Sequence, residues 1–517
     1  MALAGADRAR SAQRAASRNL QALDIRISSL EAFVEKYYWA VGSGLVGAIF
    51  IYLLYKDMRL HLWLDEIFTL YMVRLGSVSE IIDATRNGVD LTPPLYNVLA
   101  HLLLPIAPES LAIRLPATIG FSAMGVGLLW FLHHRLPALC AFVAVLLAYQ
   151  LAFPYGTEGR PYGLICGIAA LSLACWRQAA EGRNRLLSVS LLALFSGAMA
   201  ALHYFTVFFA ACLLLAELVR WRGSGKFDTA VWLAVLAPIA LVLALYYPFI
   251  VAARQKTVHF WGTAHLGFMI ELYATPAAAL LVAFLGAAFL PAAGSRRAPV
   301  AMPAHELAAI VAIAIVPVVL IVLFKVLALG FVLRYVLWSV VGISALTAFL
   351  LNFFGQGRPL LAAVVLAGLA AYVGVVEARS MARIDELRTT QPDMVALSKL
   401  PPSDEPILVT SPVASVELWF YASPELRTRL IYPDCPELDL KYLGYNAGTI
   451  GLEGLARISP LKLERCEAVL SNRKPFKLVV GNEKGDDYLV RVLASQGRAV
   501  TPDQVGDKII FDVGAAN

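Results

Sequence analysis

Two adjacent carboxylates, Asp65 and Glu66, are the residues of this sequence best placed to do chemistry. They lie in the stretch Leu62–Glu66, a few residues after the first long apolar segment and beside Trp63. Charged groups at a membrane boundary are costly and commonly functional. A carboxylate that faces a hydroxyl can act as a general base. We predict that Asp65 is a catalytic base and that Glu66 is either a second catalytic acid or a structural neighbour at a helix start.

Other polar residues collect near the ends of later apolar segments. Arginine and lysine there would bind a phosphate group, arginine through two parallel hydrogen bonds. Simpler roles are open for each: an ion pair closing a loop, an anchor to lipid headgroups, or an aromatic belt at the interface. The candidates are Tyr96, Glu158, Arg160, Tyr162, His203, Tyr204, Arg254, Lys256, Arg334 and Tyr335.

Composition places these residues in a membrane protein. Hydrophobic residues make up 59% of the 517 positions and charged residues only 15%, whereas soluble proteins average about 45–50% and about 25%. Apolar runs long enough to cross about 30 Å of hydrocarbon recur through the first three quarters of the chain. The net charge of +6 does not indicate a nucleic-acid partner, because the arginines lie mostly in short loops between these runs.

The basic loops predict which apolar runs cross the membrane. The run 94–106 is short and bounded by prolines, and counting it as a crossing would invert the bias from the second span onward. We therefore predict eleven spans, a cytoplasmic N-terminus and a C-terminus outside. Their approximate ranges are 39–55, 112–132, 136–153, 162–176, 186–202, 205–218, 229–251, 276–290, 307–327, 334–354 and 360–376.

The chain divides into three parts. Residues 1–38 form a basic cytoplasmic segment that would lie on anionic membrane lipids. Residues 39–377 form the transmembrane domain, and residues 378–517 form a periplasmic α/β domain with a mostly parallel sheet. The expected strands are 407–410, 429–432, 476–480 and 508–513, with helices at 413–421, 461–470 and 488–496.

The C-terminal domain offers no chemistry of its own in the sequence. It has no phosphate-binding glycine loop and no cysteines at metal-ligand spacing. Cys435 and Cys466 would form a disulfide if the domain lies in an oxidising compartment, and the alternative of two free thiols stays open.

Several short motifs occur in a familiar order along the chain. They are Trp63-Leu64-Asp65-Glu66, Pro93-Pro94-Leu95-Tyr96, Glu158-x-Arg160-x-Tyr162, His203-Tyr204 and Arg334-Tyr335. Taken together they resemble the bacterial relatives of protein O-mannosyltransferases and of lipid A aminoarabinose transferases. The resemblance covers roughly residues 39–350, and it extends less specifically into the C-terminal domain.

This resemblance implies the C-type glycosyltransferase fold and an inverting transfer from a polyprenyl-phosphate-linked sugar. It implies that Asp65 is the base and that Glu158 is a second acid. Many relatives have a histidine or a Glu-Lys pair where this chain has Thr92-Pro93, which removes one candidate metal ligand or phosphate contact. We therefore expect a metal-independent mechanism, with a divalent cation as the alternative.

The predicted function is that of a membrane glycosyltransferase in a bacterial inner membrane. Its partners would be a polyprenyl-phosphate sugar, an acceptor outside the cytoplasm (a glycan, a lipid or a protein) and membrane lipids, without nucleic acid. One rival is a polyprenyl-linked lipid transporter, which would have inverted repeats and acids near the bilayer midplane. Another is a membrane-anchored recognition module that acts through the C-terminal domain.

Overall fold

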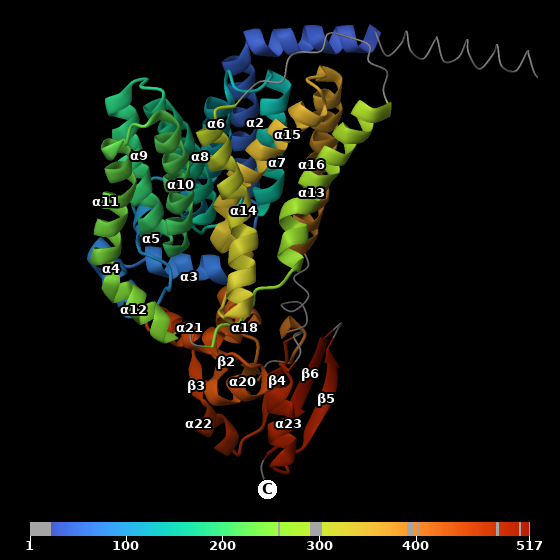
Figure 1. Ribbon diagram of the computed structural model, residues 1–517. Coiled ribbons are helices and arrows are strands. Elements are labelled where there is room, and N and C mark those ends of the chain that lie inside the picture. Colours follow the sequence, from blue (N-terminus) through green and yellow to red (C-terminus); the bar gives the residue numbers. More distant parts are fainter. Residues whose placement is uncertain are drawn as a thin grey trace, which may run out of the picture.

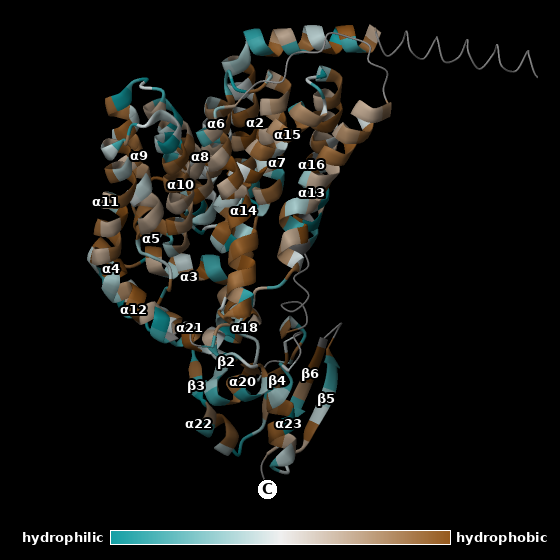
Figure 2. Ribbon diagram, viewed as in Figure 1, coloured by the Kyte–Doolittle hydropathy of each residue, from teal (hydrophilic) through white to brown (hydrophobic). Residues whose placement is uncertain are grey.

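A bundle of apolar helices carries a small α/β domain at one end (Figure 1). The computed structural model describes residues 22–256, 259–289, 302–389, 397–401, 403–481, 485–505 and 508–515. The bundle helices are hydrophobic along most of their length (Figure 2). Because a helix satisfies its own backbone hydrogen bonds, such apolar helices are suited to cross a bilayer.

Ten helical segments within the described residues are long and apolar enough to cross a membrane, or eleven if α11 and α12 form one span bent by 61°. This confirms the predicted multi-pass helical domain of about eleven spans. The helices are α2 (Tyr38–Asp57), α6 (Glu109–Leu132), α7 (Ala138–Ala152), α8 (Tyr162–Ala180), α9 (Arg185–Leu202), α10 (Val207–Ser224), α11 (Thr229–Leu245), α12 (Tyr247–Lys256), α13 (Gly267–Phe289), α14 (Ala304–Val326), α15 (Val340–Phe354) and α16 (Pro359–Thr389), with the 3-10 segments η1 (Phe153–Gly156), η2 (Tyr204–Thr206) and η3 (Leu333–Ser339).

Three short helices follow α2 and lie at the end of the bundle that faces the α/β domain (Figure 1). They are α3 (Leu64–Val73), α4 (Val78–Arg86) and α5 (Leu95–His101). The seven residues of α5 rise only about 10 Å, too little to cross a bilayer. The segment 94–106 therefore stays on one face, as the charge pattern predicts.

The basic loops meet at the opposite end of the bundle. There Arg135 donates hydrogen bonds to both carboxylate oxygens of Glu306 at 2.6 and 2.7 Å, and Arg220 donates one to Asp228 at 2.7 Å. The helical residues 22–36 run across this same end (Figure 1). The loops predicted to be cytoplasmic thus lie together at one end of the bundle.

The C-terminal domain has a six-stranded sheet in the order β3-β2-β1-β4-β6-β5. The first four strands are parallel, and β6 pairs antiparallel with both β4 and β5. Helices pack around it, so the α/β prediction is confirmed. The elements are β1 (Ile407–Val409), α18 (Pro412–Tyr421), α19 (Pro424–Arg429), β2 (Leu430–Asp434), α20 (Pro436–Tyr442), α21 (Ala447–Ala456), β3 (Leu463–Arg465), α22 (Cys466–Ser471), β4 (Phe476–Val479), α23 (Tyr488–Ser495), β5 (Val500–Val505) and β6 (Lys508–Val513).

This domain differs from the sequence prediction in several details, among them the unpredicted helices α19, α20 and α21. The expected helix 461–470 begins instead as the edge strand β3, which is too short to show a period of two. Strand β5 went unpredicted because its residues are mostly exposed and polar on an edge hairpin. The helix α16 continues to Thr389, past the predicted domain boundary at residue 378.

Cys435 and Cys466 form a disulfide, which joins the starts of α20 and α22.

The C-terminal domain shares a hydrophobic core with the short helix α3. Leu62, Ile67 and Leu70 from the membrane domain belong to the same buried cluster as Trp419 and Leu452 from the C-terminal domain. Burial of apolar surface holds such an interface together. The two domains therefore meet directly beside Asp65.

Candidate functional site

A cavity of about 690 Å³ lies where the end of the bundle meets the C-terminal domain. This volume is typical of small-molecule sites. Its walls come from the loops at this end of the bundle and from α18 and α21 of the C-terminal domain. The polar lining residues are Asp65, Asp90, Thr92, Arg160, Tyr162, His203, Tyr204, Arg254, Arg334 and Tyr335.

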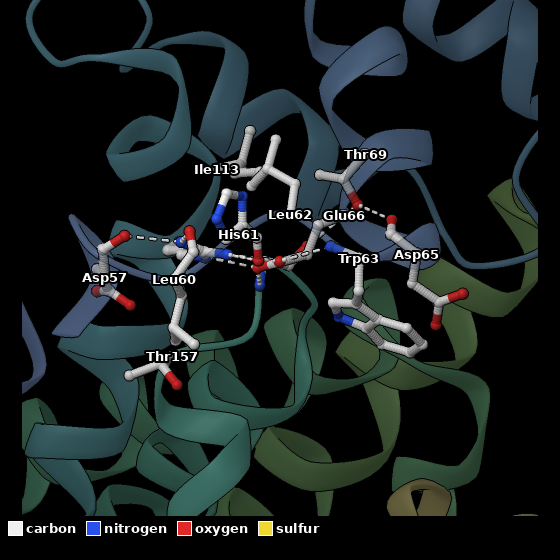
Figure 3. Close-up of polar contacts among 12 residues, drawn as sticks. Asp57, Leu60, His61, Leu62, Trp63, Asp65, Glu66, Thr69, Ile113 and Thr157 are labelled. Atoms are coloured by element: carbon white, nitrogen blue, oxygen red, sulfur yellow. Dashed lines mark hydrogen bonds and ion pairs between the residues drawn. The ribbon is translucent and has the colours of Figure 1, made fainter. Parts of the chain in front are cut away.

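Asp65 is held at this cavity by the first turn of α3. The helix begins at Leu64, with Trp63 as its N-cap residue. One oxygen of Asp65, Oδ2, lies 2.9 Å from Nη1 of Arg334 and 3.9 Å from Nε of Arg160. The Asp65 carboxylate points away from Glu66 (Figure 3). Its side chain is 18% exposed, so a ligand in the cavity can reach it.

Glu66 has a different environment, although it is the next residue. Arg114 donates two hydrogen bonds of 2.6 Å to its two oxygens, and the backbone N–H of Gly159 donates a third at 2.8 Å. Glu66 is 1% exposed and does not line the cavity. A buried bidentate pair of this kind fixes the chain locally. We assign Glu66 to the support of this loop rather than to the chemistry.

Asp90 is a site residue that the sequence reasoning missed. Its Oδ2 lies 3.1 Å from Nη1 of Arg160, and its Oδ1 accepts hydrogen bonds from the backbone and hydroxyl of Thr92 at 2.9 and 2.8 Å. Burial by itself would raise the pKa of Asp90, but the Arg160 charge and these hydrogen bonds outweigh it, so the pKa lies below its ordinary value. The sequence feature that could have pointed to Asp90 is the Asp-x-Thr spacing, which is typical of an Asx turn.

Arg334 stands between aromatic rings and acids. Its guanidinium lies 5.9 Å from the ring of Trp63 and 5.4 Å from the ring of Tyr162. Cation–π contacts of this kind restrict the plane of the guanidinium. The Nε atoms of Arg334 and Arg160 are buried and have no hydrogen-bond partner within the described part of the chain. Two unused donors therefore flank Asp65.

Glu158 lies close to Arg334 but does not line the cavity. Its Oε1 is 3.8 Å from Nη1 of Arg334. Burial raises the pKa of Glu158 to about 7, against the opposing charge of Arg334 and with the help of Asp65. Near neutral pH the Glu158 carboxyl is thus partly protonated, and it can orient Arg334 without neutralising it fully.

His203 supplies a neutral polar group to the cavity. Its Nδ1 accepts the backbone N–H of Phe205 at 3.3 Å, which leaves the proton on Nε2 in the neutral ring. Burial lowers the pKa of His203 to about 3, with the charges of Arg334 and Arg160 acting in the same direction. The ring packs 4.8 Å from that of Tyr335. His203 is therefore a hydrogen-bond donor here rather than a base.

The remaining predicted residues divide into three groups. Tyr204 and the exposed Arg254 line the cavity together with the residues above. Tyr96 is buried away from it and donates a hydrogen bond to the Ile113 carbonyl at 2.7 Å. Lys256 ends α12, and its side chain lies outside the described residues. In the described ranges, no three His, Cys, Asp or Glu side chains come together in a way that could hold a metal ion.

The C-terminal domain contributes cavity walls that no pattern in its sequence predicts. Pro412 and four residues of α21 line the cavity: Ala447, Gly448, Gly451 and Leu452. A Cβ atom at Gly448 would lie 2.8 Å from Cγ of Pro412, so the absence of a side chain permits this close packing. The C-terminal domain is thus part of the site.

Comparison with known proteins identifies the fold. No family model matches the chain, and no curated protein matches it. Two solved structures of ArnT from Cupriavidus metallidurans, a lipid A aminoarabinose transferase, are similar at 14% sequence identity, each over 92% of this chain and 98% of the other. The TM-score is 0.53 for ArnT bound to undecaprenyl phosphate and 0.41 for its apo state. The chain therefore has the C-type glycosyltransferase fold of ArnT, as the order of its motifs predicts.

Proposed function

We propose that the protein transfers a sugar from a polyprenyl-phosphate donor to an acceptor outside the cytoplasm, with inversion. The observation that carries this proposal is the arrangement at the cavity: the Asp65 carboxylate between two arginines that each keep an unused N–H donor in the described part of the chain. A base beside concentrated positive charge is what this transfer needs.

In the proposed reaction the acceptor hydroxyl oxygen attacks the anomeric carbon of the donor sugar. The bond from that carbon to the phosphate oxygen breaks, and the polyprenyl phosphate leaves. Asp65 takes the hydroxyl proton. Arg160 and Arg334 receive the phosphate, since their guanidinium groups can bind it through parallel hydrogen bonds.

The other site residues assist in this scheme. Glu158 and the rings of Trp63 and Tyr162 orient Arg334. Asp90 holds Arg160 in place. The scheme uses no metal, and chelation tests that choice. The residues that face the cavity and would contact the substrates are Tyr204, Tyr335, the N–H of His203, and Arg254, which supplies further positive charge at the wall.

The placement of the domains supports a bacterial inner-membrane protein whose cavity and C-terminal domain face the periplasm. The cavity lies at the end of the bundle away from the basic loops, and those loops prefer the cytoplasm. The disulfide between Cys435 and Cys466 fits an oxidising compartment. Undecaprenyl phosphate is the ligand of the ArnT structure with the same fold, which supports a polyprenyl phosphate as the lipid carrier here.

The test is turnover by the purified protein in lipid nanodiscs. The substrates are radiolabelled sugars on undecaprenyl phosphate, tried as a hexose, a pentose and an aminosugar, with a bacterial envelope extract as acceptor. We expect release of free undecaprenyl phosphate and transfer of label, and loss of both in Asp65→Asn. The matched control is Asp83→Asn, because Asp83 is an exposed acid of α4 that pairs with Arg86 in its own helix. Movement of intact labelled lipid across vesicles, without release, would favour a transporter instead.

A further inference from the structure

The segment that carries Asp65 is held from two sides. On the membrane side, Arg114 donates hydrogen bonds to the carbonyls of Asp57, Leu60 and His61 at 2.7–3.0 Å. On the other side, the contacts come from α18 of the C-terminal domain. The position of α3 therefore depends on a domain more than 300 residues away in the chain.

Tyr421 makes the most direct of these contacts. Its hydroxyl accepts a hydrogen bond from the backbone N–H of Leu62 at 2.6 Å and donates one to the carbonyl of the same residue at 3.1 Å. Leu62 therefore has both backbone polar groups bound to a single side chain, two residues before α3 begins. Such paired contacts fix the direction of the chain as well as its position.

Glu417 acts one helical turn earlier in α18. Its Oε1 accepts a hydrogen bond from the backbone N–H of Leu64 at 3.3 Å. Leu64 is the first residue of α3, so this N–H has no partner inside its own helix. The carboxylate of one domain thus caps the helix of the other, directly before Asp65.

Neither contact extends to the two arginines. Arg160 lies in the turn before α8 and is held by Asp90 and Thr69, while Arg334 belongs to η3. Tyr421 and Glu417 therefore act on Asp65 through the start of α3, and on Arg160 indirectly, through Thr69 of the same helix.

On this basis, and resting on the proposed transferase function, we infer that Tyr421 and Glu417 are positioning residues: the C-terminal domain places the catalytic base through the backbone of residues 62–64. A catalytic group that shifts by about 1 Å can lose about a hundredfold in rate, even when the change lies away from the chemistry. The domain would then act mainly on the chemical step, because the two contacts are to the backbone before Asp65 and not to the arginines that receive the phosphate.

The test compares kcat for sugar transfer with the Kd for undecaprenyl phosphate in full-length variants. Tyr421→Phe removes only the hydroxyl and keeps the ring that packs 5.1 Å from His61. We expect its kcat to fall about tenfold or more, while undecaprenyl phosphate binds no more than about twofold more weakly than to the parent. Glu417→Ala should behave in the same way, and Glu417→Gln should restore kcat because it retains an acceptor for the Leu64 N–H.

The control is Tyr442→Phe, since Tyr442 stacks on Tyr488 within the C-terminal domain. It should leave both constants unchanged. An unaltered kcat in Tyr421→Phe overturns the inference, and so does a parallel loss of kcat, Kd and thermal stability, which marks a merely structural contact. Absence of transfer by the parent protein is a separate outcome, because it refutes the proposed function itself.

Discussion

Replacing Asp65 with asparagine should make the protein bind undecaprenyl phosphate more tightly while it abolishes transfer. Asp65 Oδ2 lies 2.9 Å from Nη1 of Arg334. An incoming phosphate must compete with this carboxylate for the same guanidinium, and the two anions also repel each other. The Asp65→Asn substitution keeps the side-chain volume and removes the charge, so both penalties should disappear.

The size of this effect follows from the geometry. Two unit charges about 4 Å apart interact by about 1 kcal/mol in bulk water and about 4 kcal/mol at an effective dielectric constant of about 20. The Asp65 and Arg334 side chains are 18% and 17% exposed, so water screens the pair in part. We expect about 1–2 kcal/mol, which corresponds to a Kd about 5- to 30-fold tighter.

The assay is calorimetric titration of undecaprenyl phosphate into the protein in nanodiscs, at low salt and again at high salt. Salt should reduce the gain, because it screens charges that solvent can reach. Asp83→Asn should bind as the parent does, and Arg334→Ala should bind more weakly. An Asp65→Asn variant with unchanged or weaker affinity would refute the competition between Asp65 and the phosphate.

Three further predictions concern the surroundings of the site. The pKa of Glu158 is raised from an ordinary 4.5 to about 7, so between these pH values the folded state keeps a proton that the unfolded chain loses, and stability falls as pH rises. Glu158→Gln should therefore melt at a higher temperature than the parent at pH 8, and the difference should shrink at pH 5. Arg114→Ala leaves Glu66 as a buried, uncompensated charge and should cost about 3–5 kcal/mol, seen as loss of folded protein in detergent, whereas a stable variant would contradict the structural role of Glu66. Transfer should survive EDTA treatment, and activity that is lost and then restored by a divalent cation would show that the arginines do not suffice.

The apolar spans and the candidate base could be predicted from the sequence alone. Each span must satisfy its own backbone hydrogen bonds in lipid, so its apolar length is local information, and the charges of the connecting loops orient it. Asp65 stood out for the same reason, because its cost at a membrane boundary can be judged from its neighbours in the chain.

The partners of the polar groups became visible only in the folded molecule, because those partners are distant in sequence. Glu66 is adjacent to Asp65, yet it is buried, pairs with Arg114 and does not line the cavity. Arg160 reaches Asp90, whose local sequence carries only the weak signal of a turn. These pairings arise from helix packing and loop geometry, which no local pattern encodes.

The C-terminal domain is the clearest case. Its sequence indicates a sheet with helices and no chemistry, and the α/β fold is what the pattern of apolar strands predicts, apart from the edge strands β3 and β5. Only the packed molecule shows Gly451 at the cavity wall and Tyr421 on the backbone of Leu62. A glycine at a cavity wall and a tyrosine on a distant carbonyl look like ordinary residues in sequence, since their roles depend on the docking of two domains.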